Sequence, residues 1–136
     1  DILGLFMVNS LIDMGDITDI TKEQSVATLI AGIVRSVRFG HASSHGKANM
    51  MCYNYMEEHG AFSRNADGKY VVDFEKAPQV INSWANLILE TQATGNFEFA
   101  QKYAAEHASI TEGLAADVAK VNNAGIPRDI VFDFAW

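Results

Sequence analysis

Residues 21–37 read TKEQSVATLIAGIVRSV, and this stretch gives the clearest indication of the fold. Thr21 and Gln24 stand three residues apart, which is the spacing of a capping box at the start of a helix. Behind them, apolar side chains recur every three or four residues, as they do on one buried helical face. These side chains are Val26, Leu29, Ile30, Ile33, Val34 and Val37. The stretch therefore predicts an amphipathic helix that ends near Gly40.

The segments on either side predict two more helices. Residues 2–14 are apolar round nearly the whole helical circumference, so a helix there would need burial on all sides. After a short polar connection, another helix is expected from Ser44 or His45 to His59, with Gly60 as its stop. Its expected apolar face consists of Ala48, Met51, Cys52, Tyr55 and Met56.

The middle of the chain changes character at residues 61–72. The pair Asp67 and Gly68 separates Phe62 from the apolar run at residues 70–72, a pattern that predicts a short β-hairpin. A hairpin of this size is marginal by itself, so we expect it to pack on the helices.

The second half of the chain predicts three further helices. One opens at Asp73 or Glu75 and stops at Gly95, and a shorter one is capped by Asn96. Ser109 and Glu112 form a second capping box for the last helix, which stops at residues 122–125. An extended tail begins at Pro127 and ends in Phe132, Phe134 and Trp136, and such an aromatic tail is expected to dock on another surface.

Together these patterns predict a mainly α fold of about six helices with one small β-hairpin. With 136 residues, 49% of them hydrophobic and 20% charged, the chain suits a single helical unit over residues 1–136. Its first residues, Asp1 and the apolar run behind it, read like the middle of an element and lack an initiating methionine. We therefore expect a fragment of a larger protein.

Charge and composition exclude several classes of function. Ten Lys and Arg against 17 Asp and Glu give a net charge of -7 without a basic run, so we expect no nucleic-acid partner. The apolar stretches are shorter than the roughly 18 residues of a membrane helix, so we expect no membrane span. The single cysteine, Cys52, cannot form an intrachain disulfide, and its apolar neighbours predict a buried, inert thiol. This usage suits a reducing compartment, and we expect a cytoplasmic protein.

The densest polar cluster, RFGHASSHGKAN at residues 38–49, lies where two predicted helices meet. The start of a helix presents free N–H groups that favour carboxylate or carbonyl oxygens. His45 and Gly46 would place an imidazole and bare backbone beside such a ligand. The alternative is that His45 caps or packs at the helix end.

His41 and His45 stand four residues apart, the spacing of a metal pair on a continuous helix. Gly40, Ser43 and Ser44 argue against a continuous helix there, and no Cys, Asp or Glu lies nearby to complete a zinc site. We therefore assign no metal ligand to the chain, with a stand-alone metal or small-molecule binder through these two histidines as an alternative.

Glu57 and Glu58 are adjacent carboxylates, but neighbours on a helix point in different directions and do not form a facing acid/base pair. A solvated pair near the helix end is the expected arrangement.

The polar cluster resembles the segment around an active-site histidine in bacterial dipeptidyl-peptidase-III-like proteins. The similar residues are Arg38-Phe39-Gly40 and Ser44-His45-Gly46-Lys47-Ala48-Asn49. Residues 1–6, DILGLF, look like the continuation of the family's E-x-x-x-[DE] motif, whose first Glu would fall four residues before Asp1. Glu57–Phe62, the hairpin and Asp73–Lys76 follow the family's order as well.

The resemblance implies a fragment of the catalytic lobe of a two-lobed zinc peptidase that removes dipeptides from peptide N-termini. It places all three zinc ligands outside this chain, so zinc and the peptide substrate would be held with the help of the rest of the parent. By resemblance, Asp1 would orient a zinc-bound histidine, and His45 would contact the scissile carbonyl and stabilise the oxyanion. Gly46, Lys47 and Asn49 would lie against the substrate.

One position departs from the family pattern. Many members carry Arg four residues after the histidine, where this chain has Asn49. Arg would bind a carboxylate or carbonyl with two donors, whereas Asn offers a weaker neutral contact, and Lys47 is a candidate to supply the charge instead.

Two hypotheses of different classes follow. The first is a part of a zinc-dependent peptidase that supplies the substrate side of the cleft and is inactive alone. The second is a helical protein-binding or scaffold module without catalysis. They differ in whether Asp1 and His45 converge on one concave surface.

Overall fold

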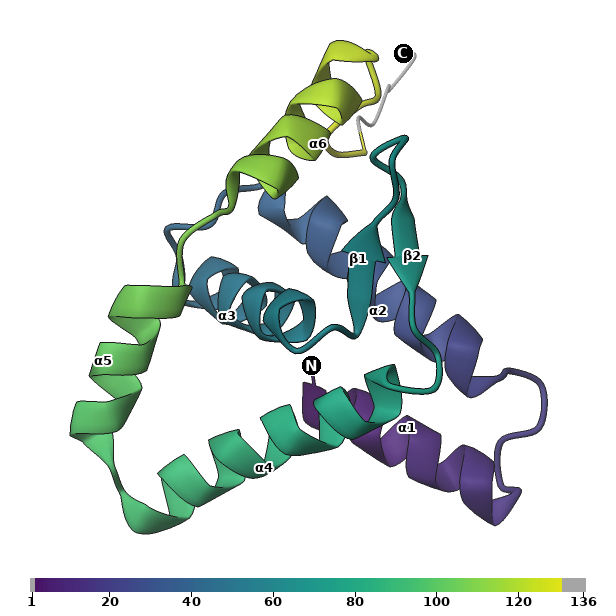
Figure 1. The fold of residues 1–136 in the computed structure, drawn as a ribbon, viewed down its shortest axis with the longest axis vertical. Coiled ribbons are helices and arrows are strands. Elements are labelled where there is room, and N and C mark those ends of the chain that lie inside the picture. Colours follow the sequence, from purple (N-terminus) through teal and green to yellow (C-terminus); the bar gives the residue numbers. More distant parts are fainter. Residues whose placement is uncertain (1, 131–136) are drawn as a thin grey trace, which may run out of the picture.

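The computed structural model describes residues 2–130, which form six helices and one two-stranded antiparallel sheet (Figure 1). The helices are α1 (Ile2–Met14), α2 (Lys22–Val37), α3 (Ser44–Glu58), α4 (Ala77–Thr94), α5 (Phe97–His107) and α6 (Glu112–Asn123). Strands β1 (Phe62–Arg64) and β2 (Tyr70–Val72) form the hairpin, in which Phe62 pairs with Val72. The predicted fold class, mainly α with about six helices and one small hairpin, is confirmed.

Helix α3 lies at the centre of the fold, where it packs against α2, α4, α5 and β1. Residues 52–56 are buried in succession, so this part of α3 is enclosed on all sides. The sequence predicted a single apolar face, and this was wrong in part. Ala48 is exposed, whereas Tyr53 and Asn54 are buried, because neighbouring elements also cover the polar side of the helix.

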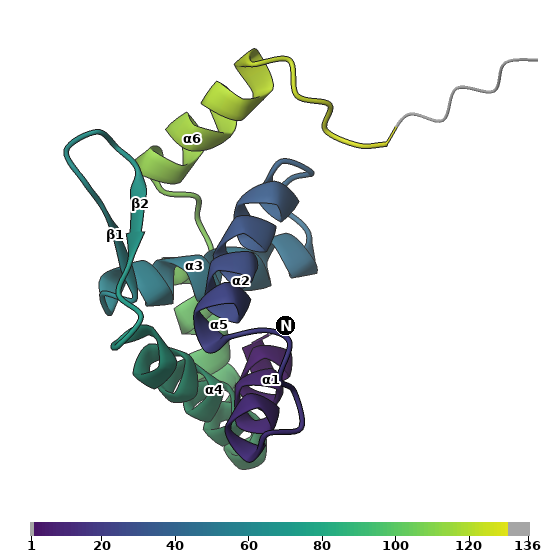
Figure 2. The same cartoon turned by 90° about the vertical axis from the view of Figure 1, so that its right-hand side faces the viewer.

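The other elements add their apolar faces to this centre. Four residues of the α2 stripe are buried, and α4 contributes three large side chains. The core also contains Phe62 of β1 and Leu114 of α6. Figure 2 shows α6 and the hairpin at one end of the molecule, α1 and α4 at the other, and α3 between them. The core members from α2 and α4 are Val26, Ile30, Ile33, Val37, Val80, Ile81 and Trp84.

Helix α1 is covered on one side only. Ile2 and Leu5 are buried against α2 and α4, whereas Phe6, Met7 and Met14 are 42%, 62% and 72% exposed. The burial on all sides that its composition predicts is therefore not met by the described residues.

The predicted helix boundaries hold for α2 and the ends of α3 and α4. At the start of α2, Gln24 N donates to Thr21 Oγ1 at 3.3 Å, and Thr21 N donates to Gln24 Oε1 at 2.9 Å, which confirms the capping box. Gly60 and Gly95 have φ of 74° and 62°, the left-handed conformation that stops a helix.

Two predicted helix starts were wrong. The last helix is capped by Thr111, whose Oγ1 accepts from Leu114 N at 3.3 Å, and not by Ser109. The Ser109 carbonyl instead accepts from the Asn54 side chain at 2.9 Å, so a tertiary contact holds this residue in the connection before the helix. Helix α4 begins at Ala77, because Asp73 caps a separate turn.

Two features of the sequence lie outside the described residues. They are Asp1 and the tail that contains Phe132, Phe134 and Trp136.

Candidate functional site

The polar cluster at residues 38–49 forms the turn from α2 to the first turn of α3. Gly40 has φ of 115°, which lets the chain reverse after α2. Ser43 caps α3 with its side chain, and Oγ accepts from Gly46 N at 3.1 Å. The helix therefore starts at Ser44, as predicted.

This helix start separates the two histidines of the possible metal pair. His41 lies in the turn and His45 in the first turn of α3, so they do not share a continuous helix. Among residues 2–130, no three His, Cys, Asp or Glu side chains are grouped so that they could hold a metal ion. The described donor set does not fit zinc.

His45 is exposed at the second position of α3, and Gly46 behind it is buried. A Cβ on Gly46 would lie 2.5 Å from His41 Cα and 2.7 Å from the Gly40 carbonyl oxygen. Only glycine fits between the helix and the turn, so Gly46 brings the backbone of residues 40–41 against the first turn of α3. This contact fixes the backbone of the helix turn that carries the His45 side chain.

The two other predicted substrate ligands are placed differently. Lys47 is exposed, whereas Asn49 is half-buried and its Nδ2 donates to Ser36 Oγ at 2.8 Å. Asn49 stands one turn beyond His45, on the same face of α3. Its amide therefore joins α3 to α2, and the residue also lines the cavity described next.

An apolar cavity of about 340 Å³ opens between α1, α2, α3, α4 and α5. Ile2, the neighbour of Asp1 in the chain, lines it together with Ala48 and Asn49. The first residue of α1 and the face of α3 that carries His45 therefore border the same cavity. The remaining lining residues are Leu29, Ile33, Met51, Cys52, Trp84, Leu87, Ile88, Thr91, Gln92, Phe99, Ala100 and Tyr103.

Titratable groups on the cavity wall are held neutral. Burial raises the pKa of the Cys52 thiol to about 12, and the side chain is 7% exposed. The predicted burial of the thiol is confirmed, and its raised pKa supports the expected lack of reactivity. Burial also raises the pKa of Tyr103 to about 12, with the Glu58 charge adding to the effect. The cavity wall thus offers apolar contact, with no ready nucleophile.

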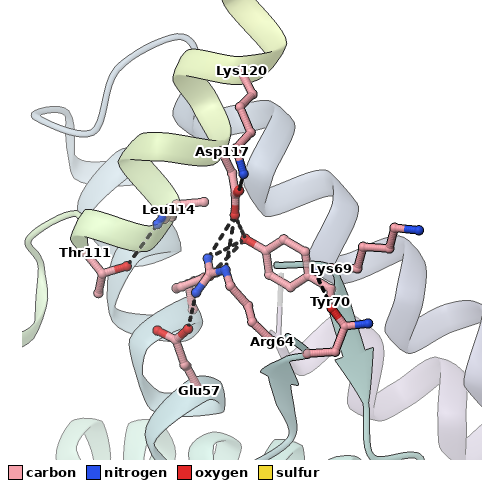
Figure 3. A network of polar contacts seen from close by, with 10 residues as sticks. Glu57, Arg64, Lys69, Tyr70, Thr111, Leu114, Asp117 and Lys120 are labelled. Atoms are coloured by element: carbon pink, nitrogen blue, oxygen red, sulfur yellow. Dashed lines mark hydrogen bonds and ion pairs between the residues drawn. The ribbon is translucent and has the colours of Figure 1, made fainter. Parts of the chain in front are cut away.

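A second polar cluster connects α3, the hairpin and α6 (Figure 3). Arg64 donates from Nη1 to Glu57 Oε1 at 2.8 Å and from Nη2 to Asp117 Oδ2 at 3.0 Å. Its Nη2 also reaches the hydroxyls of Tyr53 and Tyr70, at 2.7 and 2.9 Å. Tyr70 donates to the same Asp117 oxygen at 3.0 Å. We call these five residues the Arg64 cluster.

The charges in the Arg64 cluster stabilise one another. Burial by itself would raise the pKa of Asp117, but hydrogen bonds from Arg64, Tyr70 and Lys120 outweigh it and lower that pKa. Burial raises the pKa of Tyr70, so its hydroxyl remains protonated and can donate. Because the groups satisfy one another and none of them lines the apolar cavity, the cluster serves to hold α6 and the hairpin on α3.

Sequence reasoning missed this cluster. Arg64 and Asp117 are 53 positions apart, and no local spacing connects them. The adjacent carboxylates of Glu57 and Glu58 point in different directions, as predicted. Glu57 is not simply solvated, because it pairs with Arg64, and Glu58 lies 3.5 Å from His107.

Within residues 2–130, no helix is long and apolar enough to cross a membrane.

Comparisons with known proteins agree with this fold. No protein-family model matches the chain. A solved structure of DPP III from Caldithrix abyssi superposes with a TM-score of 0.89 and 30% identity, covering 96% of this chain and 25% of that one. The structure of dipeptidyl-peptidase III from Corallococcus sp. strain EGB gives a TM-score of 0.89 and 29% identity, covering 96% and 24%.

A protein of Arabidopsis thaliana described as Nudix hydrolase 3 is 32% identical over 130 residues, which are 96% of this chain and 17% of that protein. The chain thus spans a quarter or less of the length of each protein that it matches. The resemblance predicted from the sequence is confirmed: over 96% of its length, the chain is similar in fold and sequence to one segment of dipeptidyl peptidase III.

Proposed function

We propose that the chain is part of the catalytic lobe of a zinc-dependent peptidase similar to dipeptidyl peptidase III, and that it forms the substrate side of the cleft. The observation that carries this proposal is the similarity to two dipeptidyl peptidase III structures at 29–30% identity and a TM-score of 0.89. The chain alone would be inactive, because the described residues do not provide a set of metal ligands.

In this proposal, His45 is the catalytic residue of the chain. It is exposed in the first turn of α3, where helix N–H groups add positive potential. A ring N–H would donate to the carbonyl oxygen of the scissile peptide bond as negative charge develops on it. A zinc ion held by residues outside this chain would polarise the same carbonyl and activate water.

The neighbouring residues would bind and orient the peptide. Gly46 keeps the first turn of α3 close to the preceding turn, and the exposed Lys47 would supply a positive charge toward a carboxylate or carbonyl. Asn49 retains its amide oxygen as an acceptor while its Nδ2 is used by Ser36. Asp1 would orient a histidine that binds zinc.

The position of Ile2 supports the expected convergence of Asp1 and His45. Ile2 lines the same cavity as Ala48 and Asn49, which follow His45 on α3. The convergence of the two side chains themselves remains a prediction, as does the cytoplasmic location.

The first test reads the gene upstream of Asp1. A Glu codon four positions before Asp1, preceded by an H-E-x-x-G-H-type motif, is expected. A start codon or an unrelated linker at that place would remove the basis for the peptidase, and would favour a helical binding module that uses the exposed side of α1.

The second test assays the full-length protein for release of dipeptides from a peptide with a free N-terminus. The same peptide with an acetylated N-terminus serves as control. His45→Ala is expected to lower kcat by about 10²–10³-fold, the usual effect of losing one oxyanion donor. His59→Ala is the matched variant, because His59 follows the other end of α3 and stacks on Tyr55. Equal activity of both variants would contradict the role of His45.

A further inference from the structure

Arg38 joins the end of α2 to the last turn of α6 and to the segment that follows it. Its Nε donates to Asn122 Oδ1 at 3.0 Å, Nη2 to the Ile126 carbonyl at 2.6 Å, and Nη1 to the Pro127 carbonyl at 3.4 Å. All three guanidinium nitrogens are therefore used by a segment more than 80 positions away. Because the guanidinium is a rigid planar fork, these three acceptors together fix its orientation.

The same segment also returns contacts to the turn. Arg128 Nη1 donates to the Arg38 carbonyl at 3.5 Å, and the Arg128 guanidinium lies over the Phe39 ring at 5.8 Å from its centroid. Arg35 of α2 lies over the same ring at 5.5 Å. The turn after α2 is thus held from outside by residues 122–128 as well as by its own helix.

The turn after α2 also sets the position of the first residues of α3. The Gly40 carbonyl oxygen and the His41 backbone come so close to Gly46 that no Cβ would fit between them. A displacement of residues 40–41 therefore either opens this contact or moves the first turn of α3 with it. His45 directly precedes Gly46, so its imidazole would move too.

We propose that Arg38 is a positioning residue for His45, which it holds in place by binding the turn after α2 to the segment after α6. The expected effect of Arg38 on the position of the His45 imidazole follows from these contacts and does not require the proposed function. The effect on catalysis rests on the proposed function.

The experiment compares three variants of the full-length protein carrying ¹³C-labelled histidine. Arg38→Ala removes the three hydrogen bonds, and Arg38→Lys keeps the charge but loses the fork. Arg35→Ala is the matched control, an arginine in the last turn of α2 that contacts Phe39 but has no hydrogen bond to residues 122–127. The ring signal of His45 is assigned by its loss in His45→Gln.

Arg38→Ala is expected to shift or broaden the His45 ring signal while the His59 signal stays unchanged. kcat should fall roughly ten- to hundredfold with KM within about twofold, because a misplaced catalytic group loses rate more than binding. Arg38→Lys should fall between wild type and Arg38→Ala in both readouts and keeps the test valid if Arg38→Ala does not fold. Arg35→Ala removes only the contact with the Phe39 ring, so it should move the His45 signal and kcat less than either Arg38 variant does.

The two readouts separate this inference from the proposed function. A His45 signal that is unmoved in Arg38→Ala and Arg38→Lys overturns the inference, whatever the activity. If His45→Ala itself keeps full activity, the proposed function fails, and a shifted His45 signal in the Arg38 variants still supports the positioning role. A shifted signal with unchanged kcat, where His45→Ala is impaired, overturns the catalytic consequence.

Discussion

Arg64 of β1 and Asp117 of α6 are joined through one carboxylate oxygen, with Oδ2 lying 3.3 Å from Nε and 3.0 Å from Nη2. Their side chains are only 22% and 16% exposed, so the pair is largely screened from solvent. A Cβ on Gly113 would lie 2.7 Å from Arg64 Nη1, and the missing side chain there lets the guanidinium reach the first turn of α6. The hairpin and the last helix are therefore held together by a contact that neither element forms alone.

Asp117→Ala is expected to lower the free energy of unfolding by about 2 kcal/mol, because it leaves the Arg64 guanidinium without its main partner. Urea denaturation followed by circular dichroism measures this change. Lys120→Ala is the matched control, since Lys120 binds the other Asp117 oxygen at 3.3 Å but is 71% exposed, and it should cost less than about 0.5 kcal/mol. Additive losses in Arg64→Ala, Asp117→Ala and the double variant would show that the two residues do not interact.

The same pair should make the free energy of unfolding depend on pH in the acid range. The folded pKa of Asp117 lies below its ordinary value of 3.8, so its contribution is fully present above that value. It is lost as pH falls from about 3.8 through the lower folded pKa. The difference in unfolding free energy between wild type and Asp117→Asn should therefore be constant from neutral pH to about pH 5 and shrink below about pH 4. A difference that stays constant down to pH 2 would contradict the lowered pKa.

Gly46→Ala should destabilise the fold by about 1–3 kcal/mol, because its Cβ would overlap the backbone of the preceding turn. Gly32→Ala is the matched control in the adjacent helix. Nothing lies within 4 Å of a Cβ at Gly32, so alanine there should stabilise α2 by about 0.5–1 kcal/mol. Thermal unfolding of both variants gives the comparison, and equal effects would contradict the close approach at Gly46.

Cys52 should not react with a thiol reagent such as DTNB at pH 8 in the folded chain. Its pKa of about 12 leaves almost no thiolate, and the side chain is 7% exposed. The reaction should become rapid on adding denaturant. Ser63→Cys in a Cys52→Ser background is the control, because residue 63 is exposed and its thiol should react at once. Fast labelling of native Cys52 would contradict the burial of the thiol and its raised pKa.

The local patterns predicted most of the helices, because capping and periodicity act over a few residues. Thr21 with Gln24 made the capping box, and Gly60 and Gly95 adopted the left-handed conformation that a helix stop favours. The same kind of pattern was wrong at Ser109. There a hydrogen bond from the distant Asn54 side chain outweighed the local preference, and the helix began two residues later than the capping box implied.

The candidate site was predicted in its sequence position but not in its surroundings. The histidine at the start of α3 and the glycine beside it follow from a cluster of neighbouring residues. The cavity that Ile2 shares with Asn49 joins segments nearly 50 positions apart, so no local pattern could reveal it. The use of Asn49 as a bond to Ser36 was hidden for the same reason.

By itself, the sequence determined the mainly helical fold, the start of α3 with His45 on its first turn, and the resemblance to dipeptidyl peptidase III, because these depend on residues close together in the chain. Only the tertiary structure decided which polar groups meet. Arg64 reaches Asp117, and Arg38 reaches the carbonyls of residues 126–127, across separations of 53 and more than 80 positions. Such pairs form because packing of the apolar helix faces brings distant segments together. Largely buried charges such as Arg64 and Asp117 then need partners, whereas the contacts of Arg38 form at the exposed surface.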